Sequence, residues 1–278
     1  MTISNIDTGP VYYRHMQFTS GAKVRTSLPN LFGVGPGRSG TSFLYGLLAA
    51  HSDVLVSPVK ETNFFGVLQE GYRKGGLSLR DYERLFAHPV EREYTYIAEV
   101  TPVYLFSQGA ISEIKNACGY PKVIVTLRHP IDRAHSQFKH HAEHHKHQTF
   151  DQYVEEGLEQ LSLNPRRRGH WFAAGTNLRQ SLYAGDIAQA WELFGRERVQ
   201  ILMYEELKTN PEAWIKRLAD FLELPLEYTE HQAKRYRNAS PEGQLDIDPV
   251  LHEQLRGLYR EDISKLGLMG IDTSLWTL

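Results

Sequence analysis

The stretch GVGPGRSGTSFLYGLL, residues 33–48, joins a short apolar run to an amphipathic one. The run Leu31–Val34 predicts a buried strand, and the apolar spacing that follows predicts a helix over Thr41–Ala50. Glycines between the two allow the backbone to curl so that successive N–H groups point inward, and the helix adds the positive end of its dipole. The stretch therefore predicts a strand-loop-helix cradle for an anion such as a phosphate.

The loop matches the first half of a Walker A phosphate loop but not the second half. Gly35 and Gly40 are separated by four residues, as in that loop. A Walker loop continues with a Lys for the terminal phosphates and a hydroxyl residue for magnesium, whereas Thr41 and Ser42 follow here and the cation is Arg38, inside the loop. An anion held by a guanidinium, hydroxyls and amides needs no metal bridge. An ATP-dependent kinase or NTPase remains an alternative, although this chain lacks the Lys that a Walker loop needs.

Strand-like and helix-like segments alternate along the rest of the chain. Short apolar runs recur at residues 54–56, 94–98, 123–127 and 199–203, and helical periodicity fills the intervals, for example over Ile131–His147 and Leu178–Leu193. This alternation predicts an α/β fold in which a central parallel sheet is flanked by helices. With 278 residues and 41% hydrophobic content, we expect a single domain over residues 1–278, with residues 1–28 as an N-terminal extension.

Composition excludes several classes of protein. A formal net charge of -2 argues against a nucleic-acid binder, because non-specific affinity for polyanions comes from clustered Lys and Arg. Cys118 is the only cysteine, which excludes an intrachain disulfide framework and fits a reducing compartment. The first residues lack the apolar core of a signal peptide, and no apolar run is long enough to span a membrane. We therefore expect a cytoplasmic protein without a membrane span, and composition leaves its oligomeric state open.

A second candidate anion site lies in VIVTLRHPIDRAHSQF, residues 123–138. Arg128 stands at the carboxyl end of a predicted buried strand, and Pro130 suits the first turn of the helix that carries Ser136. Ligands of open α/β sheets bind at such strand ends, and an Arg with a hydroxyl about two helical turns further on can hold one phosphate from two sides. The alternative is an ion pair between Arg128 and Asp132 or a carboxylate elsewhere in the chain. The Gly-rich loop at another strand end favours the phosphate.

The segments GPGRSGTSFLY, VKETNFFG and VIVTLRHPIDRAHSQF together resemble the signature of sulfotransferases that use 3′-phosphoadenosine 5′-phosphosulfate (PAPS). LYAGDIAQAWELFG and VQILMYEEL also look like this family, so the resemblance extends from about residue 31 to 207. It implies an enzyme that moves a sulfuryl group from PAPS to a hydroxyl or amine of a small-molecule or carrier-bound acceptor, without a metal.

The resemblance also implies roles for individual residues. The loop would hold the 5′-phosphosulfate, with an Arg where many members carry Lys, and Arg128 and Ser136 would hold the 3′-phosphate. Tyr183 resembles a tyrosine near the 3′-phosphate, with a core aromatic as its alternative. The loop residues concerned are Arg38, Ser39, Gly40, Thr41 and Ser42.

Glu61 is the predicted general base. It follows the second predicted strand, and in related sulfotransferases a Glu in this region has that role. Burial against Phe64 and Phe65 would make this carboxylate a more effective base, whereas Lys60 opposes that effect, so we assign the Lys60 ammonium to orienting the sulfate or the acceptor. A solvated loop carboxylate is the alternative for Glu61.

Acceptor contacts are predicted from the neighbouring segments. Asn63, Thr101 and Tyr104 fall in segments that line the acceptor site in the family, although packing or capping roles are equally open. Many sugar-directed members have Lys where Val100 stands here, which argues against a glycosaminoglycan acceptor. Further candidates are His140 and His141, because Ser136 and His140 share one face of the predicted helix.

A zinc hydrolase is a further alternative. His140, Glu143 and His144 have the His-x-x-Glu-His spacing in which two His on one helix face bind zinc and the Glu activates water. That reaction needs another, distant ligand and leaves both anion sites unexplained. The several His of this segment instead fit a solvent-exposed helix face whose imidazole side chains titrate near neutral pH.

Overall fold

The computed structural model describes residues 23–66, 78–107, 109–145, 147–164, 173–227 and 245–276. The strands are β1 (Val24–Arg25), β2 (Leu31–Val34), β3 (Val54–Val56), β4 (His88–Pro89), β5 (Tyr96–Val100), β6 (Lys122–Leu127) and β7 (Val199–Met203). The helices are α1 (Thr41–Ala50), α2 (Leu79–Glu83), α3 (Ala110–Cys118), α4 (Pro130–His140), α5 (Phe150–Leu163), α6 (Ala174–Arg179), α7 (Ala184–Phe194), α8 (Tyr204–Thr209), α9 (Pro211–Leu222) and α11 (Pro249–Leu268). Short 3-10 turns are η2 (Arg84–Phe86), η3 (Pro102–Leu105), η4 (Ala142–His145) and η5 (Arg196–Arg198).

Five strands form a parallel sheet in the order β3-β5-β2-β6-β7, which confirms the predicted α/β fold. The central strand β2 is buried along its whole length, as expected for a strand covered on both faces. The chain leaves β2 toward β3 on one side and later passes to β6 on the other side. The carboxyl end of β2 is therefore a point where the strand order reverses, the place where such sheets bind ligands.

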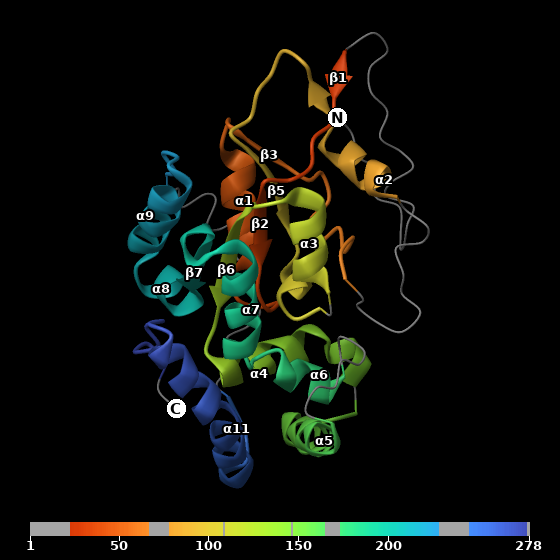
Figure 1. The fold of residues 1–278 in the computed structure, drawn as a ribbon. Coiled ribbons are helices and arrows are strands. Elements are labelled where there is room, and N and C mark those ends of the chain that lie inside the picture. The colour runs from red at the N-terminus through yellow and green to blue at the C-terminus, as the bar shows by residue number, and fades with distance from the viewer. Residues whose placement is uncertain are drawn as a thin grey trace.

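Helices cover both faces of the sheet (Figure 1). On one face, Phe43 and Leu44 of α1 and Trp214 of α9 share an apolar cluster. On the other face, residues of α3 and α7 pack with Phe32 and Val125. A third cluster joins α4, α5, α6 and α11, which gather beyond one end of the sheet in Figure 1. Within the described ranges, no helix combines the length and apolar content that crossing a membrane requires.

Several predicted boundaries were wrong. Strand β5 continues to Val100, although the prediction stopped at Ala98 because a charged Glu99 follows. The helix predicted over Ile131–His147 ends at His140 and is followed by η4. The segment predicted as one helix over Leu178–Leu193 is divided between α6 and α7, and the sequence analysis missed α8, which follows β7 without an intervening loop.

The N-terminal end of the described chain forms strand pairs with a later segment. β1 pairs with β4 in a two-stranded antiparallel sheet, with Val24 opposite Pro89 and Arg25 opposite His88. The extension predicted for residues 1–28 therefore includes a paired strand, and residues 1–22 lie outside the described residues.

Candidate anion-binding and active site

The Gly-rich loop between β2 and α1 has the backbone of an anion cradle. Gly35 has φ 126°, and a Cβ there would lie 2.4 Å from the backbone oxygen of Thr126, so only glycine fits between β2 and β6. Gly40 has φ 90° and begins α1 without a side-chain cap, and the first turn of α1 holds no acidic residue. The helix therefore offers backbone N–H groups and the positive end of its dipole to an anion.

A buried hydroxyl marks the inside of this cradle. The Ser39 side chain is 1% exposed, and its Oγ has no hydrogen-bond partner among the described residues. Thr41 is also buried, and Ser42 is half-buried. A buried polar atom without a partner is uncommon in folded proteins. Its position in an uncapped, glycine-lined loop fits a polar ligand that would supply the missing bond.

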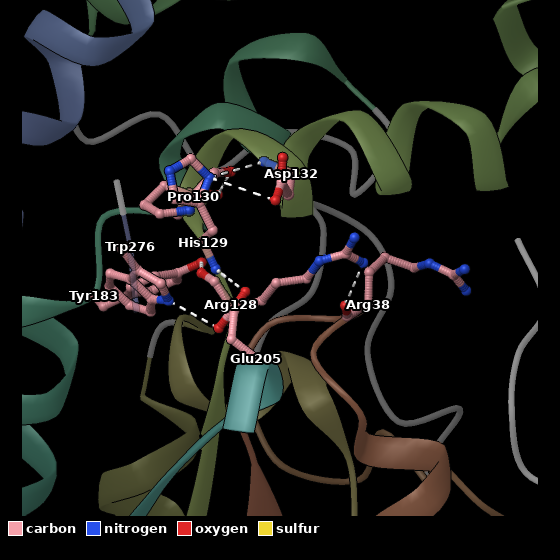
Figure 2. A network of polar contacts seen from close by, with 9 residues as sticks. Arg38, Arg128, His129, Pro130, Asp132, Tyr183, Glu205 and Trp276 are labelled. Carbon is pink, nitrogen blue, oxygen red and sulfur yellow. Dashed lines mark hydrogen bonds and ion pairs between the residues drawn. The ribbon is translucent and has the colours of Figure 1, made fainter. Parts of the chain in front are cut away.

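The structure brings Arg38, Arg128 and Ser136 together, and Figure 2 shows the Arg128 side chain beside Arg38. The Nε of Arg38 donates to Ser136 Oγ at 3.1 Å, and an Nη of Arg128 donates to the backbone oxygen of Arg38 at 3.2 Å. Burial lowers the pKa of Arg38, and the charge of Arg128 lowers it further. Two neighbouring guanidinium groups repel each other, so an anion that contacts both is favoured electrostatically.

Arg128 makes no ion pair with a carboxylate within the described part of the chain. Asp132, its alternative partner from the sequence, lies 3.8 Å from Nδ1 of His129 instead. The Arg128 guanidinium lies over the ring of Tyr204, 4.8 Å from its centroid. The Arg128 charge is therefore supported by an aromatic ring and the backbone oxygen of Arg38, and it is available to a ligand.

Tyr183 holds the backbone of this site. Its side chain is 1% exposed, and its hydroxyl donates to the backbone oxygen of Arg128 at 2.8 Å. Burial raises the pKa of Tyr183, so it stays a neutral donor. The described geometry is that of a core aromatic in contact with Arg128, and its predicted proximity to a 3′-phosphate stays a prediction.

Lys60 and Glu61 form an ion pair on the loop after β3. The Glu61 side chain is 44% exposed, whereas Phe64 and Phe65 are buried in the core, where Phe64 stacks on Tyr82. The burial against these two rings that would make Glu61 a more effective base is therefore not present. The exposed carboxylate is held by Lys60, and its backbone N–H donates to Val100 at 3.1 Å.

Backbone strain is concentrated around these charges. Arg38, Glu61 and Asn63 have φ of 71°, 64° and 52°, and of the described non-glycine residues only Glu223, at the end of α9, shares this left-handed region. The Asn63 side chain donates to the backbone oxygen of Glu61 at 2.9 Å and helps to hold this conformation. Such strain persists where the surrounding structure fixes it, often at functional sites.

The buried carboxylate of Glu99 supports the strained loop through hydrogen bonds from side chains around it. Glu99 is 0% exposed and accepts hydrogen bonds from Thr101 at 2.6 Å and from Tyr104 at 2.8 Å, as well as from Thr62 and Tyr82. The backbone N–H of Phe64 donates to the Tyr104 hydroxyl at 2.8 Å. Thr101 and Tyr104, predicted as acceptor contacts, are both fully buried. Their observed role is to fix the loop that carries Glu61.

Replacement of Glu99 by Gln is expected to change how stability depends on pH. Burial raises the pKa of Glu99. At a pH between the usual carboxyl pKa and this raised pKa, Glu99 is therefore protonated in the folded protein and ionised in the unfolded chain. Stability from this group is complete below the usual carboxyl range and falls as pH rises through the raised pKa. Glu99→Gln should flatten that part of a plot of Tm against pH, measured by thermal unfolding. Glu253→Gln, at an exposed ion pair, should leave the slope unchanged.

His140 and His141 differ in their surroundings. Partial burial lowers the pKa of His140, the charges of Arg38 and Lys60 lower it further, and Glu61 opposes them. His140 is therefore close enough to respond to the charges of the Glu61 loop and the Gly-rich loop. His141 is 6% exposed, its Nε2 lies 2.8 Å from the side-chain nitrogen of Gln137, and burial lowers its pKa to about 4.

The His-x-x-Glu-His spacing does not lie on one helix. α4 ends at His140, and Glu143 and His144 belong to η4. Among the described residues, no group of three or more His, Cys, Asp or Glu side chains is arranged to hold a metal ion. The helical geometry that the zinc alternative requires is therefore contradicted.

Sequence analysis missed Tyr204 and Glu205 at the start of α8. Glu205 accepts a hydrogen bond from the backbone N–H of His129 at 2.8 Å, next to Arg128. Both residues follow directly after the carboxyl end of β7. The strand-end rule that singled out Arg128 also applies to them, and it is the signal that would have found them.

Comparison with known proteins identifies relatives of this chain. The profile of the sulfotransferase domain family matches residues 28–242. A mouse bifunctional heparan sulfate N-deacetylase/N-sulfotransferase 4 is 25% identical over 234 residues, which are 79% of this chain and 25% of that protein. A mouse heparan sulfate glucosamine 3-O-sulfotransferase 3B1 is 27% identical over 208 residues, 74% of this chain and 49% of that protein. The chain thus spans about a quarter of the length of the first of these relatives.

Solved structures show the same fold. A sulfotransferase from Alicyclobacillus acidocaldarius superposes with a TM-score of 0.71 at 25% identity, covering 90% of this chain and 99% of that one. Mouse sulfotransferase SULT7A1, solved in complex with PAP, gives a TM-score of 0.51 at 16% identity and covers 84% of each chain. The second similarity concerns the fold alone.

Proposed function

The chain belongs to the sulfotransferase domain family, and on this basis we propose that it transfers a sulfuryl group from PAPS to a hydroxyl or amine acceptor. The observation that carries the proposal is the convergence of Arg38, Arg128 and Ser136 on a glycine-lined, uncapped helix start that contains the partnerless Ser39 hydroxyl. This arrangement supports a ligand with two separated anionic groups and needs no metal to neutralise it.

The two anionic groups of PAPS fit the two parts of the site. The loop amides, Arg38 and the hydroxyls of residues 39, 41 and 42 would hold the 5′-phosphosulfate, and Arg128 with Ser136 would hold the 3′-phosphate. During transfer, the acceptor atom forms a bond to sulfur while the bond between sulfur and the bridging oxygen of the 5′-phosphate breaks. Negative charge grows on that oxygen, and the Arg38 guanidinium stabilises it.

The acceptor would enter beside the strained loop. Glu61 takes the proton that the acceptor loses, Lys60 orients the sulfuryl group, and Asn63 fixes the backbone of Glu61. His140 is a second candidate base, because it lies within the electrostatic influence of Glu61 and Arg38. We propose a small-molecule or carrier-bound acceptor. Val100, which stands where many sugar-directed members carry Lys, argues against a glycosaminoglycan acceptor, the substrate class named in the curated relatives.

Binding of adenosine 3′,5′-bisphosphate (PAP), the product of the donor, tests the proposal. PAP at about 100 times its Kd should stabilise the protein by about 2.7 kcal/mol, whereas ADP and ATP with magnesium, which have no 3′-phosphate, should stabilise it far less. The measurement is a thermal-shift titration of the intact chain. Stabilisation by ATP with magnesium but not by PAP would instead support the kinase alternative, and preferential stabilisation by zinc would revive the hydrolase.

A further inference from the structure

The C-terminal segment, residues 245–276, contacts the Arg128 site although it lies beyond the family match, which ends at residue 242. Asp262 of α11 accepts hydrogen bonds from the backbone N–H groups of Tyr183, at 2.6 Å, and Ala184, at 3.2 Å. These bonds cap the start of α7 and fix Tyr183, whose hydroxyl donates to the Arg128 backbone. Helix α11 thus supports one side of the Arg128 turn.

Trp276 also supports that turn, through the side chain of Glu205. Its indole Nε1 donates to Oε2 of Glu205 at 2.8 Å, while the backbone N–H of His129 donates to Oε1 of the same carboxylate at 2.8 Å. The indole is 6% exposed and lies 5.9 Å from the ring of Tyr183, measured between centroids. Figure 2 shows the Glu205 carboxylate between His129 and Trp276, with the Arg128 side chain directed toward Arg38.

The position of Glu205 presents an electrostatic problem for anion binding. Because Glu205 is bonded to the backbone of His129, the residue after Arg128, its carboxylate is a potential partner for the Arg128 guanidinium and would compete with a phosphate for it. In the structure, one donor occupies each of its oxygens. A carboxylate whose oxygens are both bonded has less tendency to rotate toward another cation. The indole N–H therefore has a function beyond the packing of the Trp276 ring.

We propose that Trp276 is a positioning residue for the 3′-phosphate site: its indole N–H holds Glu205 on the His129 backbone and away from Arg128, so that Arg128 remains available to the ligand. This inference rests on the proposed function, because it assigns Arg128 to the 3′-phosphate of PAP. It adds the C-terminal segment to the donor site.

The test compares the affinities for PAP and for 5′-AMP, which lacks the 3′-phosphate. Trp276→Phe keeps an aromatic ring against Tyr183 and removes only the N–H donor. We expect PAP affinity to fall about three- to tenfold, the effect of one lost hydrogen bond of ordinary strength, while 5′-AMP affinity stays within about twofold. The measurement is isothermal titration calorimetry on the full chain, with Tm recorded for each variant.

A matched control and a double variant isolate the mechanism. Trp191→Phe also removes an indole N–H, but the Trp191 nitrogen has no hydrogen-bond partner among the described residues, so this change should leave both affinities unaltered. Glu205→Gln removes the competing charge, and in that background Trp276→Phe should cause no further loss of PAP affinity. Glu205→Gln alone keeps the proposal testable if Trp276→Phe folds poorly, because removing the competing charge should leave PAP affinity no lower than in the wild-type protein, and a loss of PAP affinity would overturn the proposal.

The outcomes separate this inference from the proposed function. A wild-type protein that binds PAP and 5′-AMP equally would overturn the proposed function and the inference with it. A wild-type protein that prefers PAP, together with a Trp276→Phe variant that keeps the full preference, would overturn the inference alone. Equal losses for both ligands in Trp276→Phe, or additive losses in the double variant, would also overturn it, because they indicate a packing role only.

Discussion

Arg128→Ala is expected to weaken PAP binding by about 2–4 kcal/mol, because it removes the two-donor, charge-assisted contact that we propose for the 3′-phosphate. The affinity for 5′-AMP, which has no 3′-phosphate, should change little. Isothermal titration calorimetry with both nucleotides measures the difference. Equal losses for the two ligands would show that Arg128 supports the fold of the site and does not bind the 3′-phosphate.

Two further variants refine this result. Arg198→Ala is the matched control, since Arg198 also donates to a backbone oxygen, that of Tyr120 at 2.9 Å, but on the surface near the start of β7. It should leave both affinities unchanged. Arg128→Lys keeps a positive charge but loses the planar pair of donors, so it should recover only part of the PAP affinity.

Local signals in the sequence predicted the elements that carry the site. The bounds of β2, β3, β7 and α1 agree with the structure, because glycines, prolines and changes in hydrophobic period mark their ends within a few residues. The parallel sheet followed from the same alternation. Gly35, Gly40 and Arg128 were found because strand ends and glycine-rich turns are local features.

Long-range contacts explain what the sequence did not reveal. Glu99 is buried in β5 with its carboxylate satisfied in part by the hydroxyl of Thr62, which is 37 residues away. The break between α6 and α7 is fixed by Asp262, which caps the helix start at Ala184 from 78 residues away. No pattern within a window of 10–20 residues records such partners.

In the site, too, local motifs identified the residues, whereas contacts between residues far apart in the sequence were not predicted. The sequence suggested that Arg128 and Ser136 share one phosphate, and the structure adds that Ser136 accepts a bond from Arg38, which is 98 residues away. It also places Lys60 against Glu61 where burial by two phenylalanines had been expected. Side-chain burial depends on the whole core, so neighbouring aromatic residues in the sequence are a poor guide to it.

Glu61→Gln should lower turnover by roughly 10²–10⁴ while PAP affinity stays nearly constant. The amide keeps the size of the side chain but does not accept a proton from the acceptor at neutral pH. Arg38→Ala should lower both turnover and PAP affinity, because its charge meets the donor in the ground state and more strongly as the bridging oxygen gains charge. Labelled PAPS with a working acceptor measures turnover, and calorimetry measures affinity.

Asn63→Ala provides the control for the shape of the loop, because it removes the bond to the Glu61 backbone without removing the carboxylate. A smaller loss of turnover than in Glu61→Gln would separate the proton acceptor from the strained backbone that holds it. Near-normal turnover in Glu61→Gln would exclude Glu61 as the base. His140 and His141 would then be the next residues to test, and His140 comes first because its lowered pKa favours a neutral imidazole that accepts a proton near neutral pH. In that case, His140→Gln should lower turnover to the extent expected here for Glu61→Gln.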